Sequence, residues 1–127
     1  MSDVVIDSSA VLALLNQENG SEEVSQFIGN AAISTVNLSE VVAKLAEAGI
    51  PEEDISQILS SLSLEVVLFS EEQALKAGML RPSTKSKGLS LGDRACLALG
   101  ISLNLPILTT DRLWSSLSLE VEVRVLR

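Results

Sequence analysis

The pattern of hydrophobic and polar positions divides the chain into two kinds of segment, which alternate along it. Short apolar runs bounded by polar or turn residues are typical of buried strands, and they occur at residues 4–6, 32–36, 64–69, 106–109 and 121–126. Between them lie segments with helical spacing or helix start signals, at residues 8–15, 21–28, 37–48, 51–62, 70–80 and 91–103. This order predicts an α/β fold with a mainly parallel central sheet of four to five strands flanked by helices.

Two stretches in the second half of the chain lack the regular spacing of apolar residues that is typical of a helix or a strand. Pro82 weakens the end of the helix before it, and residues 83–88 are polar and basic, which predicts a loop. Residues 111–117 predict a short turn or helix. The helix at 91–103 is almost wholly apolar and should be buried, so Cys96 is expected to be a small core residue. We expect Trp114 to pack under the last strand.

Composition narrows the class of protein. With 127 residues the chain is long enough for one domain, expected over residues 1–127, and its 46% hydrophobic but 2% aromatic content requires an aliphatic core. Mean hydropathy is positive, yet the apolar runs are far shorter than the roughly 20 residues that span a bilayer. The sequence shows no signal peptide, and its single cysteine excludes a disulfide framework. These features predict a cytoplasmic protein without a membrane segment.

Charge and the absence of histidine restrict the chemistry further. Without His, a Ser-His-Asp triad, a His general base and a His-Cys zinc site are excluded. The formal net charge of −8 argues against nucleic acid and suits a basic partner or bound cations. One local positive patch is still possible, because four cations fall in a short stretch: Arg81, Lys85, Lys87 and Arg94.

Acidic residues follow several of the predicted strands. Asp7 comes directly after the first strand, Asp111 follows the strand at 106–109, and Glu40 lies a few residues after the second strand. Asp93 lies at the start of the buried helix. Ligands of parallel sheets bind beyond the carboxyl ends of the strands, so at least three of these acids are expected at one edge.

Each acid also has a simpler explanation. Glu40 lies three residues after Asn37, and Asp93 lies three after Ser90, which is the spacing of a helix capping box. Glu40 also has Lys44 four residues later, so a solvated ion pair would account for it. Asp7 and Asp111 can act as helix N-caps.

A cluster of such acids is harder to explain by capping. Carboxylates brought close together repel, and one of them would take up a proton unless a cation is bound. Mg²⁺ and Mn²⁺ prefer carboxylate oxygen and water as ligands, so a site rich in acids and free of His favours these ions over zinc.

Four motifs, in this order and spacing, resemble those of PIN-domain ribonucleases, and more narrowly of VapC-type toxins of toxin–antitoxin pairs. They are Val5-Ile6-Asp7-Ser8-Ser9-Ala10, Asn37-Leu38-Ser39-Glu40-Val41, Gly88-Leu89-Ser90-Leu91-Gly92-Asp93-Arg94 and Leu108-Thr109-Thr110-Asp111-Arg112-Leu113-Trp114. The resemblance spans nearly the whole chain. It implies a PIN-like fold in which Asp7, Glu40 and Asp93 are the core metal-binding acids and Asp111 is a fourth, more variable one.

The resemblance also assigns supporting positions. Ser9 matches the small hydroxyl residue after the first acid, and Thr109 and Arg112 match positions that flank the site. The activity implied is hydrolysis of RNA phosphodiester bonds, with one or two Mg²⁺ or Mn²⁺ ions held by the four acids. The candidate cations for contact with the RNA backbone are Arg81, Lys85, Lys87, Arg94 and Arg112. An ordinary solvated loop explains the first four equally well.

Partners follow from the same resemblance. VapC-type toxins form homodimers and are silenced by a small cognate antitoxin that commonly places a basic side chain in the acidic site, which an acidic toxin surface suits. The helices at 22–28 and 55–62 are candidate contact surfaces, although core burial explains their apolar positions equally well.

Two other functions are weighed against the nuclease. The first is a PIN-like binding or scaffold module without catalysis. The second is a receiver-type or phosphatase-type domain with a phosphorylated Asp7. A phosphatase of that type has a second Asp two residues after the first, where this chain has Ser9, and the acid pair and late Lys of a receiver are missing.

Overall fold

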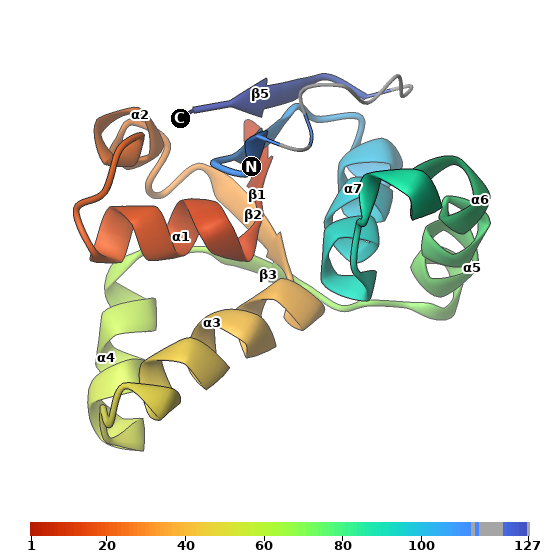
Figure 1. The fold of residues 1–127 in the computed structure, drawn as a ribbon. Helices are drawn as coiled ribbons and strands as arrows, with labels where there is room; N and C mark the ends of the chain where they lie inside the picture. Colours follow the sequence, from red (N-terminus) through yellow and green to blue (C-terminus); the bar gives the residue numbers. More distant parts are fainter. Residues whose placement is uncertain (113, 115–120, 127) are drawn as a thin grey trace.

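A parallel sheet forms the centre of the computed structural model, which describes residues 1–112, 114 and 121–126 (Figure 1). Its strands are β1 (Val4–Ile6), β2 (Ala31–Ser34), β3 (Glu65–Val67), β4 (Ile107–Thr109) and β5 (Val123–Val125). The strand order is β3-β2-β1-β4-β5, and every neighbouring pair is parallel. The predicted α/β class and mainly parallel sheet are confirmed.

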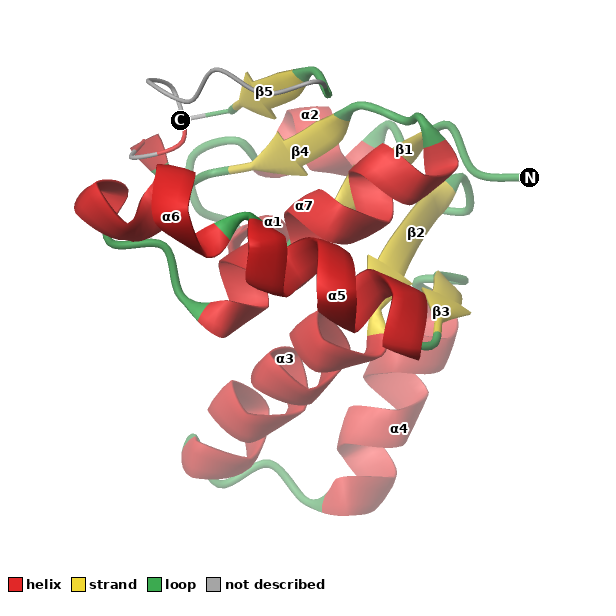
Figure 2. Ribbon diagram, turned by 90° about the vertical axis from the view of Figure 1, so that its right-hand side faces the viewer, coloured by secondary structure: helices red, strands yellow, loops and turns green. Residues whose placement is uncertain are grey.

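Helices cover both faces of this sheet. They are α1 (Ser8–Leu15), α2 (Ser21–Ser25), α3 (Thr35–Glu47), α4 (Glu52–Ser61), α5 (Glu71–Met79), α6 (Arg81–Thr84) and α7 (Leu91–Leu103), with a 3₁₀ turn η1 (Lys85–Lys87). Helices α1 to α4 lie on one side and α5 to α7 on the other (Figures 1 and 2). No helix in the described part of the chain is long and apolar enough to cross a membrane.

Two aliphatic clusters hold the layers together, and alternate residues of β1 belong to different ones. Val4 and Ile6 pack with residues of α1, α3 and α4, whereas Val5 packs with α7 and with Trp114. This alternation follows from the two-residue period of a strand. Trp114 is fully buried and the partly buried side chains of β5 pack against its cluster, so its predicted place under the last strand is confirmed.

The loop predicted for residues 83–88 is wrong, because this stretch forms α6 and η1. Pro82 lies in the first turn of α6, where a backbone N–H has no helical acceptor and proline is well tolerated. The hydroxyl of the buried Thr84 donates to the Leu80 carbonyl at 2.8 Å and fastens this turn to the end of α5. Of the predicted turn at 111–117, residues 113 and 115–117 lie outside the described residues.

Helix α3 begins two residues earlier than the sequence pattern predicts. Ser34, the last residue of β2, is its N-cap and accepts a hydrogen bond from the Val36 amide at 3.2 Å. Asn37 is therefore the third helical residue rather than the cap, and Glu40 lies in the second turn. The capping explanation for Glu40 is wrong, since the strand leads straight into a helix that Ser34 already caps.

The position of β1 in the sheet determines where a site can form. The chain leaves β1 through α1 and returns at β2 on one side, whereas β4 occupies the other side. The order of strands thus reverses between β1 and β4, which is where parallel sheets open a crevice for ligands. Asp7 follows β1 at this edge, and Thr110 and Asp111 follow β4.

Candidate metal-dependent nuclease site

Asp7 is the most enclosed acid at this edge, with 3% of its surface exposed. Its Oδ1 accepts a hydrogen bond from the Ala10 amide at 2.9 Å, so it is the N-cap of α1 as predicted. Its Oδ2 accepts from the Thr109 hydroxyl at 2.6 Å. The Ser9 hydroxyl lies 2.8 Å and 2.9 Å from the two carboxylate oxygens and donates to one of them at a time.

These hydroxyls join Asp7 to the end of β4. The Ser9 and Thr109 oxygens are 3.2 Å apart, and each also accepts a hydrogen bond from the loop that follows β4. The Thr110 amide donates to Ser9 at 3.1 Å, and the Asp111 amide donates to Thr109 at 3.0 Å. The network thus fixes the position of the Asp111 backbone relative to the Asp7 carboxylate.

Burial raises the pKa of Asp7 from 3.8 to about 6, and the hydrogen bonds from Thr109, Ala10 and Ser9 oppose only part of this shift. The charge of Asp93 raises the pKa further. A carboxylate that is both desolvated and near another acid favours a proton or a metal ion beside it.

Asp93 serves as a helix cap and also belongs to the acidic cluster. Its Oδ2 accepts from the Ser90 amide at 2.9 Å, while its own amide donates to the Ser90 hydroxyl at 3.2 Å, so the predicted capping box is present. Burial raises the pKa of Asp93, and the charges of Asp111 and Glu40 raise it further. Capping therefore explains the local geometry of Asp93 but leaves its proximity to other acids unexplained.

The thiol of Cys96 lies in the electrostatic field of the same acids. Cys96 is fully buried, as predicted, and burial raises its pKa well above the usual range. The charges of Asp7, Asp93 and Glu40 all add to that shift, which places all three within electrostatic reach of one buried atom in the middle of α7.

Glu40 is oriented by residues outside its own helical turn. Its Oε1 accepts a hydrogen bond from Asn37 Nδ2 at 2.9 Å, and its carboxylate packs against the Cα of Gly92. No ion pair joins Glu40 to Lys44 in the described structure, so the ion-pair explanation is wrong. Both side chains instead line a hollow of about 360 Å³ between α1 and α3, together with Ser8 and Leu12.

Asn37 and Gly92 are therefore two site residues that were not predicted from the sequence. Asn37 lies in the buried stripe of α3 formed by Asn37, Val41 and Leu45, where an apolar residue is expected. A polar residue at a position where the helical spacing predicts burial was the signal that could have identified Asn37. Nothing in the sequence indicates that Gly92 contacts Glu40, because the contact depends on how α3 and α7 pack.

The donor set suits a hard divalent cation, since it consists of carboxylates and hydroxyls. Among the described residues, no three acidic or Cys side chains form a ready-made group that would hold one ion. That arrangement is compatible with Mg²⁺, which is usually bound through one or two carboxylates and keeps several water ligands. The acids thus fit such an ion without enclosing it completely.

The predicted RNA-binding cations are distributed unevenly. Arg112 lines a second hollow, of about 480 Å³, with Ser9, Thr110 and Asp111 on the β4 side. Arg94 donates from Nη1 to the Ala77 carbonyl at 3.1 Å and so is held between α7 and α5. Three further cations are exposed on α6 and η1: Arg81, Lys85 and Lys87. The substrate-binding role of all five remains a prediction.

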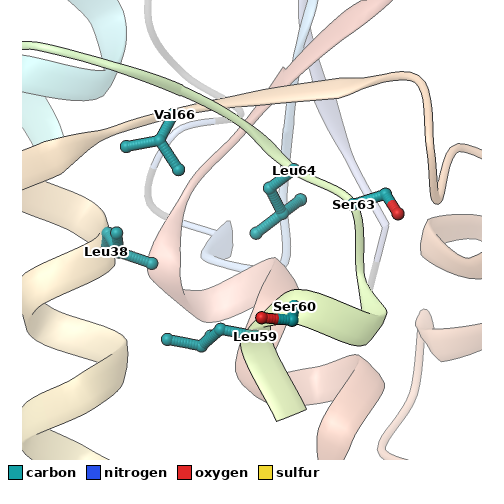
Figure 3. Close-up of a pocket in the computed structure, with 6 residues that line it drawn as sticks. All are labelled: Leu38, Leu59, Ser60, Ser63, Leu64 and Val66. Atoms are coloured by element: carbon teal, nitrogen blue, oxygen red, sulfur yellow. The ribbon is translucent and has the colours of Figure 1, made fainter. Parts of the chain in front are cut away.

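A third hollow, of about 350 Å³, contains none of the predicted site residues (Figure 3). Its lining includes Leu38 of α3, Leu59 of α4 and Val66 of the edge strand β3. The helices proposed as contact surfaces are largely committed to the core, because Val24 and Ile55 are buried there. Leu59 and Ser60 are the residues of those helices that line this hollow.

Comparison with known proteins agrees with the fold. The sequence profile of the PIN domain family matches residues 4–118, so the chain belongs to the PIN domain family. No curated protein sequence gives a significant match.

Several solved structures share the fold at low sequence identity. A DNA-bound VapBC complex from Salmonella typhimurium superposes with a TM-score of 0.76 at 18% identity, covering 100% of both chains. A toxin–antitoxin complex from Klebsiella pneumoniae gives 0.77 at 17% identity, covering 98% of both. VapC20 of Mycobacterium tuberculosis, a toxin that cleaves the sarcin–ricin loop, gives 0.72 at 15% identity, covering 94% of this chain and 98% of that one.

Proposed function

We propose that this protein is a metal-dependent endoribonuclease and the toxin of a toxin–antitoxin pair. The observation that carries the proposal is the desolvated Asp7 carboxylate, raised in pKa, in the field of Asp93 at the switch point of a PIN-family sheet. Building such a site without a bound cation is unfavourable, because burial penalises its negative charge. The likeness to VapC20 and to toxin–antitoxin complexes supports the choice of substrate and biological class.

We assign Mg²⁺ or Mn²⁺ to Asp7, Glu40, Asp93 and Asp111. When bound, such an ion lowers the pKa of a water ligand and offsets negative charge on a phosphate. Within the chain, Ser9 and Thr109 hold Asp7 in one orientation and leave it ionised beside the cation. The Ser90–Asp93 capping box restrains the Asp93 side chain, and the positive end of the α7 dipole adds a modest attraction for anions.

An RNA strand has room on both sides of the acids. The hollow on the β4 side carries Arg112, and the hollow between α1 and α3 carries Lys44. We expect both cations to lie near backbone phosphates when RNA is bound, with Lys85 and Lys87 contributing at longer range. Since the chain has a net charge of −8, binding should be weak and strongly dependent on ionic strength.

We further propose a small antitoxin with a basic segment as the partner and a homodimer as the active form. An acidic toxin surface favours a basic partner, and the acids at the strand ends would attract its Lys or Arg side chain in competition with the metal. Both proposals depend on the toxin assignment and can be tested separately from catalysis.

The test is cleavage of a mixed RNA substrate by the purified protein. We expect phosphodiester cleavage with Mg²⁺ or Mn²⁺, and its loss in EDTA. Mapping of the products should give 5′-phosphate and 3′-hydroxyl ends. Cleavage that continues in EDTA would reject the metal assignment, and no cleavage of any RNA despite bound Mn²⁺ would reject the nuclease.

The scaffold alternative predicts a different pattern in the same experiment. A non-catalytic PIN-like module would bind RNA or a protein partner without cutting it, and Asp7→Asn would leave that binding intact. Binding of RNA without cleavage by both wild type and Asp7→Asn would favour the scaffold module.

A further inference from the structure

We propose that Asn37 is a positioning residue for the nuclease reaction, acting by fixing the Glu40 carboxylate against the first turn of α7. This inference rests on the proposed metal-dependent function, which it extends to a side chain outside the acidic cluster. Three features support it: the two hydrogen bonds that Asn37 donates, the burial of Asn37 and the absence of a side chain at Gly92.

Asn37 Nδ2 connects two helices. It donates to Glu40 Oε1 at 2.9 Å within α3 and to the Gly92 carbonyl at 3.0 Å in α7. Since Gly92 directly precedes Asp93, a single amide group relates the Glu40 carboxylate to the start of the segment that carries Asp93. Glu40 would otherwise have three freely rotating side-chain bonds by which to leave the site.

Gly92 shapes the opposite wall of this contact. A Cβ built at this position would overlap with the Glu40 carboxylate, with its carbon atom Cδ at 2.7 Å. The obstructing atoms are the end of a side chain and not backbone, so a methyl group there would displace Glu40 while leaving the helices in place. Asn37 and Gly92 thus hold the carboxylate between a hydrogen-bond donor and a bare Cα.

The local energetics suggest that Asn37 is retained for its donor and not for stability. Asn37 is 1% exposed, and its Oδ1 has no hydrogen-bond partner in the described structure. An unpaired buried oxygen is destabilising, because it has lost its hydrogen bonds to water without replacing them. Leu has the same number and branching of side-chain heavy atoms as Asn, has no unpaired oxygen and matches the apolar stripe with Val41 and Leu45. A purely structural position would accept Leu at least as well as Asn.

The experiment compares Asn37→Leu with wild type in three measurements. We expect an unchanged or higher Tm, at least about tenfold weaker Mn²⁺ binding by electron paramagnetic resonance titration, and about tenfold lower kcat, the range seen when partners of metal ligands are removed. Gly92→Ala should weaken Mn²⁺ binding in the same direction, because it displaces the same carboxylate.

Gln73→Leu is the matched control. Gln73 is also a buried amide with an unpaired oxygen, but it lies on α5, on the opposite face of the sheet from α3. Its replacement should leave Mn²⁺ affinity and cleavage within about twofold of wild type, as usual for a position without partners in the site. An equal loss in both variants would overturn the proposal in favour of general repacking.

A double-mutant cycle with Glu40→Gln tests whether Asn37 acts through Glu40. If it does, Asn37→Leu should add little to the loss of Mn²⁺ affinity already caused by Glu40→Gln. Fully additive losses would overturn the proposal, as would an Asn37→Leu protein that melts lower but binds Mn²⁺ normally. These failures differ from failure of the nuclease assignment, in which wild type itself neither binds Mn²⁺ nor cleaves RNA.

Discussion

The N-terminal halves of α3 and α7 carry the same sequence pattern, a polar residue followed three positions later by an acid, yet the two patterns form different structures. In α7, Ser90 and Asp93 cap their own helix. In α3, Asn37 lies inside the helix and reaches across to the Gly92 carbonyl of α7. The difference is set by the residue at which each helix begins. A capping pattern therefore identifies a local bond but does not indicate whether the acid also belongs to a functional site.

The largest expected effect separates the two roles of Asp93. Asp93→Asn keeps an oxygen that can accept from the Ser90 amide but removes the charge, so we expect at least about a 1000-fold loss of kcat with a stable fold. Ser90→Ala removes the cap and keeps the carboxylate, which should cost about 1 kcal/mol of stability and leave cleavage largely intact. Urea unfolding and RNA cleavage assays measure both. Equal and small effects of the two variants on cleavage would mean that Asp93 is only a cap.

The same comparison extends to Asp7, which caps α1 but is more deeply buried. Because its folded-state pKa is raised to about 6, the ionised carboxylate opposes folding as pH rises from about 4 to 6 in metal-free protein. Asn can keep the bond from the Ala10 amide without the charge, so Asp7→Asn should be more stable by roughly 3 kcal/mol at pH 7 and equal to wild type near pH 4.

Urea unfolding in EDTA at several pH values measures this difference. A difference in the free energy of unfolding between Asp7→Asn and wild type that does not change with pH would contradict the raised pKa of Asp7. Addition of Mn²⁺ should stabilise wild type and reduce this difference in the free energy of unfolding, since a ligand that binds only the folded state stabilises it.

The smallest effect concerns the true start of α3. Ser34 caps this helix, so Ser34→Ala should lower the free energy of unfolding by about 1 kcal/mol. Among the described residues, no hydrogen bond joins the Ser34 side chain to Glu40 or the neighbouring acids. Cleavage measured well below the melting temperature should therefore stay within about twofold of wild type. A large loss of Mn²⁺ binding in this variant would show that α3 positions Glu40 through its first turn rather than through Asn37.

The sequence predicts most of the fold because its signals are local. Apolar runs and helix caps determine the strand–helix order, and Asp7 and Ser90 both cap the helices expected of them. The convergence of the acids follows from a parallel sheet, since strand ends share one edge. Both inferences require only patterns within a few residues or the order of elements.

Two errors concern bonds within a few residues, and the omission of Asn37 and Gly92 concerns contacts between distant segments. The early start of α3 depends on a strand that runs into a helix at Ser34, and the helical turns at residues 81–87 depend on Thr84 bonding back to α5. The positions of Asn37 and Gly92 depend on the packing of α3 against α7, over a separation of 55 residues. No local rule places these residues in the site.

The most direct test of the account is a crystal of the protein soaked in Mn²⁺, with anomalous diffraction used to locate the ion. We predict a peak beyond the ends of β1 and β4, with at least two carboxylates from Asp7, Glu40, Asp93 and Asp111 among its ligands. A map without a peak there, from protein that cleaves RNA only when Mn²⁺ is present, would contradict the central claim.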